Sequence, residues 1–109
     1  MPGNAALRAS APVFAALGDE TRLRLVSRLS SGGPASIARL TAGSSVTRQA
    51  ITKHLQVLAG AGLVHGRRRG RERVWELRPH QFEQARQSLE SISRQWDEAL
   101  GRLKAFVER

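Results

Sequence analysis

Six polar residues near the middle of the chain recur at helical spacing, and their side chains can hydrogen-bond to base pairs. Arginine and lysine donate to guanine or to phosphates, glutamine pairs with adenine, and the threonine methyl group contacts thymine. Ile51, Leu55 and Leu58 mark the opposite side of the same helix as its core side. An ordinary solvated helix face would show the same pattern, but the arginine-rich segment that follows favours contact with the major groove of double-stranded DNA. The predicted contact residues, called the recognition face below, are Thr47, Arg48, Gln49, Thr52, Lys53 and Gln56.

Arginine is concentrated in the segment after this helix. Leu63 and Val64 begin a predicted strand that returns over residues 73–77, and Gly70 can supply the positive φ of a tight turn between the two strands. Arginines at the tip of such a hairpin fit a narrow minor groove and its flanking phosphates. Trp75 could stack on a base, but a single tryptophan in a strand beside a small core is more typical of packing. The predicted DNA-binding arginines of this wing are Arg67, Arg68, Arg69, Arg71 and Arg73.

The positive charge of the chain is local. The net charge is +9, and residues 47–78 hold eight Lys or Arg against two Glu, whereas residues 79–109 balance five against five. Such a basic stripe is expected for phosphate binding rather than for solubility alone. Two classes of function stay open: a sequence-specific regulator of transcription, and a non-specific nucleic-acid-binding or nucleoid-type architectural protein. RNA binding is less favoured, because the aromatic residues occupy predicted core or helix-seam positions.

These residues need a scaffold, and the patterns along the chain predict a mainly α fold with a small β-hairpin, a winged helix-turn-helix. We expect one domain. Residues 1–17 would hold a short N-terminal helix over 9–17, residues 19–62 the helix-turn-helix core, residues 63–78 the wing, and residues 79–109 a long C-terminal helix.

Within the core segment, Asp19 is the expected N-cap of the first helix. Its predicted core stripe is Leu23, Val26 and Leu29, joined by Leu25. A short helix is expected at about residues 36–41, followed by a turn over residues 42–45 and then by the helix that carries the recognition face. The sequence therefore places a helix-turn-helix directly before the wing.

The last predicted helix carries an apolar stripe spaced by three and four residues over its whole length, which is typical of a seam with another helix. At about 1.5 Å per residue this helix exceeds 40 Å, longer than one small domain covers. We expect it to meet its own copy in a homodimer, with the N-terminal helix beside it; a stripe that folds back on its own domain is the alternative. The predicted dimer-interface residues are Val13, Phe14, Leu17, Phe82, Leu89, Ile92, Trp96, Leu103 and Phe106.

With these residues in place, the chain resembles the ArsR family of bacterial winged-helix repressors. The matching runs are F-A-A-L-G-D-E-T-R-L-R-L-V-S-R-L, S-V-T-R-Q-A-I-T-K-H-L-Q-V-L-A-G-A-G-L-V and G-R-E-R-V-W-E-L-R-P, while the tail S-R-Q-W-D-E-A-L-G-R-L-K-A-F-V-E resembles a metal-independent branch. The resemblance implies a homodimer joined through its terminal helices that binds inverted-repeat operators and shuts off transcription. It also places Thr47, Arg48, Gln49, Thr52 and Lys53 on the operator-contacting helix, and residues 69–73 on the wing.

Metal sensing, which the resemblance would suggest, is not expected in this chain. There is no cysteine, and residues 34–38 read Pro-Ala-Ser-Ile-Ala where sensors of the family carry their cysteines. A zinc site from His80, Glu83 and partner carboxylates is not expected. His54 is expected to be structural, and His65 is a strand residue.

No cofactor is expected, and the residues assign no small-molecule inducer. An enzyme is not expected either, because the chain has no cysteine nucleophile, nucleophile elbow or phosphate-cradling glycine loop. No stretch approaches the roughly 18 apolar residues of a membrane span. We expect a cytoplasmic protein.

Overall fold

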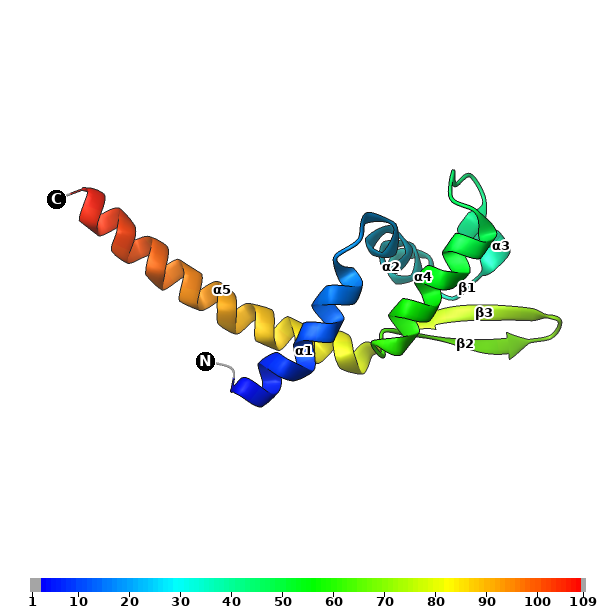
Figure 1. The fold of residues 1–109 in the computed structure, drawn as a ribbon, viewed down its shortest axis with the longest axis horizontal. Coiled ribbons are helices and arrows are strands. Elements are labelled where there is room, and N and C mark those ends of the chain that lie inside the picture. Colours follow the sequence, from blue (N-terminus) through cyan, green and yellow to red (C-terminus); the bar gives the residue numbers. More distant parts are fainter. Residues whose placement is uncertain (1–2, 109) are drawn as a thin grey trace.

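A computed structural model of the chain describes residues 3–108; residues 1–2 and 109, at the outer ends of the predicted segments 1–17 and 79–109, lie outside the described part. A helical body carries a hairpin on one side and a long helix on the other (Figure 1), with overall extents of 65 × 30 × 20 Å. The predicted winged helix-turn-helix is confirmed. The elements are α1 (Asn4–Leu17), α2 (Glu20–Gly32), β1 (Ala35–Ser36), α3 (Ile37–Thr41), α4 (Arg48–Gly60), β2 (Val64–Arg69), β3 (Glu72–Leu77) and α5 (Pro79–Val107).

The core lies where α2, α3 and α4 meet the base of the hairpin. Leu25 and Leu29 are buried on α2, and Ile51 and Leu55 are buried on α4. The expectation that Leu23 belongs to this core is wrong, because 51% of the residue is exposed. It precedes Leu25 by two residues, which is about 200° around a helix of 3.6 residues per turn, so the two side chains point in opposite directions.

The sheet has three antiparallel strands in the order β1-β3-β2, one more than the expected hairpin. The additional strand β1 pairs Ala35 with Trp75 and Ser36 with Val74. Ser36 also caps α3, because its hydroxyl accepts a hydrogen bond from the backbone N–H of Arg39 at 3.3 Å. A two-residue strand has no periodicity of its own, so only its distant partner β3 reveals it.

Helix α1 is longer than expected. It runs from Asn4 to Leu17 and continues through Pro12, although proline lacks an N–H and disfavours a helix interior. The first part of α5 supports it, because the two helices pack together and the hydroxyls of Ser10 and Ser88 share a buried hydrogen bond of 2.9 Å. Tertiary packing therefore outweighs local propensity here.

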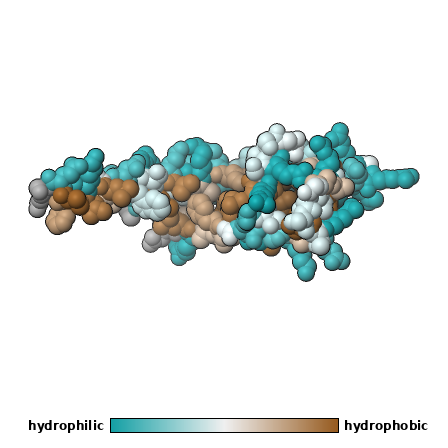
Figure 2. All heavy atoms as spheres, turned by 90° about the horizontal axis from the view of Figure 1, so that it is seen from above, coloured by the Kyte–Doolittle hydropathy of each residue, from teal (hydrophilic) through white to brown (hydrophobic). Residues whose placement is uncertain are grey.

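Helix α5 has 29 residues and divides into a packed part and an exposed part. Ala85, Ser88 and Ser91 are buried on the side that faces α1. Beyond them the helix leaves the body (Figure 1), and hydrophobic residues line one side of it while hydrophilic residues line the other (Figure 2). The exposed large apolar residues of α5 are Leu89, Trp96, Leu100, Leu103, Phe106 and Val107.

The expectation that Val13 lies in a dimer interface needs correction. It is 1% exposed and belongs to the core of its own chain, so it has almost no surface to offer to a partner. Phe14, Leu17 and Phe82 pack against the same core but stay partly exposed. Ile92 is partly buried as well, so a second chain would find the largest apolar surface further along α5.

Candidate nucleic-acid interface

The start of α4 is fixed by hydrogen bonds from its own turn. Thr47 is the N-cap, and its hydroxyl oxygen accepts from the backbone N–H of Ala50 at 3.1 Å. Before it, Ser44 accepts from the N–H of Val46 at 3.0 Å, and Gly43 takes a positive φ of 73° that a side chain would strain. Thr47 is therefore a capping residue first, and its free hydroxyl hydrogen can still be donated to DNA.

The recognition face lies along one side of α4 and is exposed except at Thr52, which is half-buried, while Ile51, Leu55 and Leu58 on the opposite side are buried. Its members form a shallow groove lined by Arg48, Gln49, Thr52, Lys53 and Gln56. The structure thus brings together five of the six predicted contact residues in one groove. The sixth, Thr47, caps the N-terminus of the same helix.

The hydroxyl of Thr52 is engaged within its own helix. Its hydroxyl donates a 2.9 Å hydrogen bond to the carbonyl oxygen of Arg48, one helical turn earlier. That bond uses the only hydroxyl hydrogen, so what Thr52 offers outward is a hydrogen-bond acceptor and its methyl group. A methyl group matches the thymine methyl in the major groove.

Behind the recognition face, Arg22 joins three helices. Its Nε donates to the carbonyl oxygen of Ala16 at the end of α1 at 2.5 Å, and its Nη1 lies 3.2 Å from Nδ1 of His54 on α4. Arginine only donates, so Nδ1 accepts and the ring is in the tautomer protonated at Nε2. His54 is therefore the structural residue predicted from the sequence. The sequence does not predict this role of Arg22, because nothing near it in the sequence points to a partner 32 residues away.

Asp19 completes this junction between α1, α2 and α4. Its carboxylate caps α2 by accepting from the backbone N–H of Arg22 at 3.0 Å, and it lies 3.8 Å from Nδ1 of His54. The backbone hydrogen bond, followed by the charge of the Arg22 side chain, holds the pKa of Asp19 below its usual 3.8. The N-terminus of α2 is therefore capped by a carboxylate that is charged at neutral pH.

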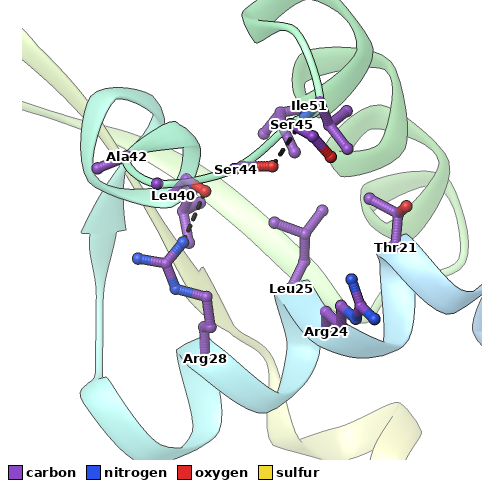
Figure 3. A pocket seen from close by; sticks show the side chains of 11 residues that line it. Thr21, Arg24, Leu25, Arg28, Leu40, Ala42, Ser44, Ser45 and Ile51 are labelled. Atoms are coloured by element: carbon purple, nitrogen blue, oxygen red, sulfur yellow. Dashed lines mark hydrogen bonds between the residues drawn. The ribbon is translucent and has the colours of Figure 1, made fainter.

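A hollow of about 350 Å³ separates α2 from the turn before α4 (Figure 3). Leu25, Leu40 and Ile51 form its apolar lining. At one side Arg28 donates to the carbonyl oxygens of Leu40 and Arg39, both at 2.7 Å. This guanidinium therefore ties the end of α3 to α2 and fixes the turn from which α4 starts.

The wing is a hairpin whose strands pair in continuous register from Val64 opposite Leu77 to Arg69 opposite Glu72. Two residues, Gly70 and Arg71, connect the strands. Gly70 has a positive φ of 63°, as the first central residue of a two-residue hairpin turn requires. The tip predicted at Gly70 is confirmed, and the hairpin extends beyond the helical body (Figure 1).

Strand alternation divides the wing arginines between two faces. Arg67 lies on the face of His65 and Glu76, and the same carboxylate oxygen of Glu76 is 3.2 Å from Arg67 Nε and 2.8 Å from His65 Nε2. Arg69 follows on this face. Arg68 and Arg73 lie opposite each other on the other face, together with Trp75, and Arg71 is in the turn.

Trp75 is 5% exposed and belongs to the core, so its predicted packing role is confirmed. The Arg73 guanidinium lies over its indole ring, 5.2 Å from the centroid. The sequence gives no sign of this contact except the alternation of Arg73 and Trp75 along one strand.

Within residues 3–108, no group of three His, Cys, Asp or Glu side chains is placed to hold a metal ion. His80 contacts Gln84 at 3.3 Å, and Glu83 pairs with Arg86 rather than with a histidine. Among the described helices, none is long and apolar enough to cross a membrane.

Comparison with known proteins agrees with this geometry. A helix-turn-helix domain family model matches residues 17–67. The chain is 44% identical to the HTH-type transcriptional regulator YuzN of Bacillus subtilis (strain 168), over 57% of this chain and 74% of the relative. A solved structure of an ArsR-like transcriptional regulator from Rhodococcus sp. RHA1 has a TM-score of 0.72 at 35% identity, and the match covers 92% of this chain and 93% of that one.

A more distant solved structure shares the fold. It is described as the homodimeric winged helix-turn-helix DNA-binding domain of Mb0332 from Mycobacterium bovis, a possible ArsR-family transcriptional regulator. Its TM-score is 0.63 at 24% identity, and the match covers 88% of this chain and 85% of that one.

Proposed function

Because the chain belongs to the ArsR family of helix-turn-helix transcriptional regulators, which bind DNA and are not enzymes, we propose that it is a homodimeric repressor of an inverted-repeat operator. The observation that carries the proposal is the division of α4. One side is buried against the core, and the other forms one groove lined by Arg48, Gln49, Thr52, Lys53 and Gln56. These are the side-chain types that distinguish base pairs in the major groove.

The turn and junction behind α4 support a role in sequence recognition. A helix that discriminates between bases must enter the groove at a fixed angle, and a small displacement breaks its hydrogen bonds. Arg28 fixes the start of α4 through α3, and Arg22 fixes its middle through His54. An arginine patch that only neutralises phosphates would not need such support.

The exposed stripe on α5 supports the homodimer. Trp96 is 65% exposed, and Leu100 and Leu103 follow it on the same side of the helix. A large contiguous apolar surface on a small chain marks an interaction site. The related fold of Mb0332 is described as homodimeric, and a twofold dimer presents two α4 helices to two half-sites of an inverted repeat. A dimer bound over a promoter would exclude RNA polymerase and so repress transcription.

A binding assay tests this function. The DNA upstream of the protein's own gene is searched for an inverted repeat, and a labelled duplex of it is titrated beside a duplex of scrambled sequence at one salt concentration. We expect a preference of about 10³ or more for the repeat. Equal affinity for both duplexes would instead identify a non-specific architectural protein. Transcription from the same fragment in vitro should fall as the dimer is added; an increase would contradict repression.

A further inference from the structure

The two faces of the wing hairpin differ in how far their arginines are neutralised. On the outer face, defined by His65, Arg67 and Glu76, one carboxylate serves both the arginine and the histidine. On the inner face, defined by Gly66, Arg68, Arg73 and Trp75, neither arginine forms an ion pair with a residue in the described range 3–108. The free positive charge of the wing is therefore concentrated on the inner face and at the tip.

The inner face of the hairpin contains a surface depression. Its volume is about 420 Å³, and it is lined by Gly66, Arg68, Arg71, Glu72 and Arg73; we call it the Arg73 site. Three arginines stand there against one glutamate, which leaves an excess of positive charge. An anion that enters this site would be held by guanidinium donors on more than one side.

Arg73 is held in place by its neighbours. Its guanidinium lies on the indole of Trp75, which is itself fixed in the core. A Cβ atom on Gly66 would stand 2.6 Å from Arg73 Nε and 3.3 Å from two ring carbons of Trp75. The glycine therefore makes the room in which Arg73 lies flat across the strand pair. Such an arginine loses less conformational freedom on binding than a free surface arginine.

The Trp75 ring supplies a second observation at this place. Its Nε1 is buried and has no hydrogen-bond partner among the described residues. The ring carbon Cε2, which is bonded to Nε1, is one of the two that approach Gly66. The indole is thus buried directly behind Gly66, and it shapes the Arg73 site by supporting the Arg73 guanidinium.

We propose that the Arg73 site binds a phosphate of the DNA backbone, so that the wing meets DNA with its inner face. This rests on the DNA-binding function. The core side of the hairpin, marked by Val64 and Trp75, is the side on which the helices pack. The Arg73 site continues that side outward, so it can follow the same duplex that α4 enters. Arg67, whose charge is neutralised by Glu76 on the outer face, contributes little.

Two substitutions with the same change in net charge test which face binds. Arg73→Ala and Arg67→Ala each remove one arginine from the same hairpin, on opposite faces. Affinity for a random duplex is measured from about 50 to 200 mM salt, where the log–log slope reports the number of neutralised phosphates at about 0.9 each. For a dimer, Arg73→Ala should make the slope shallower by about 2, and Arg67→Ala by less than half of that.

Gly66→Ala tests the geometry of the Arg73 site without changing the net charge. Its methyl group must displace the Arg73 guanidinium, and we expect affinity to fall on the order of tenfold. Gly60→Ala is the matched control, because a Cβ at Gly60 has no atom within 4 Å and should leave affinity unchanged. Arg73→Lys keeps the charge but not the planar group, so it should resemble Gly66→Ala. Thermal melting of every variant shows that the domain is folded.

The outcomes distinguish this proposal from the DNA-binding function on which it rests. Wild-type protein that fails to bind any duplex at low salt would refute the DNA-binding function itself. Binding that Arg67→Ala and Arg73→Ala weaken equally, or that Gly66→Ala leaves intact in a folded protein, would refute the Arg73 site alone.

Discussion

The helix-turn-helix body and the far end of α5 carry the same kind of amphipathic pattern but differ in what covers it. In the body, Leu55, Leu58 and Leu63 are completely buried, because α2, α3 and the hairpin close around them. At the far end of α5, Trp96 and Leu103 are more than half exposed. An apolar stripe on a helix thus indicates a face that packs against something. The position of the helix in the fold decides whether residues of the same chain can pack on that face.

The serines on α5 show the same principle within one helix. Ser88 and Ser91 are buried although they are polar, because they face α1 at close range and Ser88 bonds to Ser10. Leu89, the neighbour of Ser88, is 52% exposed. The side that packs against α1 of the same chain is built from small residues, and the side with the larger apolar residues stays exposed.

The largest effect is expected from a charge in the exposed stripe. Leu103→Glu should separate the proposed dimer, since a carboxylate buried there without a partner costs about 3–5 kcal/mol. Operator binding should then be lost, because each single α4 contacts only a half-site. Ala105→Glu is the control: it introduces the same charge about 200° around the exposed helix, away from the stripe. Equal behaviour of the two variants in sedimentation would show that the stripe is not an interface.

The next effect concerns the recognition face. Gln49→Ala should lower operator affinity by about 1–3 kcal/mol per half-site, while affinity for random duplex stays nearly constant, because base contacts carry the sequence information. Fluorescence anisotropy on both duplexes measures the difference. Gln84→Ala removes an exposed glutamine from α5 and should change neither affinity. A Gln49 variant that loses both affinities in parallel would mean that α4 contacts phosphates only.

A smaller effect is expected from the junction that supports α4. Arg22→Gln removes a charged link between α1 and α4, so it should lower the melting temperature and weaken operator binding more than random binding. Arg24→Gln is the control, because Arg24 is exposed and pairs only with Glu20 among the described residues. If Arg22→Gln melts early but keeps the full operator preference, Arg22 stabilises the fold without positioning α4.

The smallest effect is a dependence of stability on pH. The pKa of Asp19 is lowered in the folded chain, so its carboxylate contributes stability above its ordinary value of 3.8. That contribution is lost as the pH falls through the lower folded value. Asp19→Asn keeps a good N-cap but no charge, so its melting temperature should converge with that of the wild type in acid and lie below it at neutral pH. A difference in melting temperature that stays constant from acid to neutral pH would assign the effect of the substitution to packing instead of charge.

Local patterns were enough to predict several parts of this molecule. The exposed face and cap of α4 follow from Thr47, Ile51 and Leu55, and the hairpin turn follows from Gly70. The parts that the sequence did not reveal all depend on contacts between distant segments. Strand β1 exists only through its pairing with β3, and α1 extends to Asn4 where α5 supports it.

The same limit applies to the candidate site. Five arginines in the wing predicted a basic surface, but the sequence gives them equal weight. Only the paired register shows that Glu76 neutralises Arg67 while Arg73 lies on Trp75. The link from Arg22 to His54 joins residues 32 positions apart and has no local signal. Charge and periodicity therefore predict a candidate site, and only the tertiary geometry distinguishes among its members.

The mass of the protein in solution tests the central comparison most directly. If the exposed stripe of α5 is covered by a second copy, sedimentation equilibrium at micromolar concentration should give about twice the chain mass of 12.0 kDa, and Leu103→Glu should return it to the single-chain value. A wild-type protein that sediments as a 12.0 kDa monomer at these concentrations would contradict the account, because α5 would then be exposed for some partner other than its own copy.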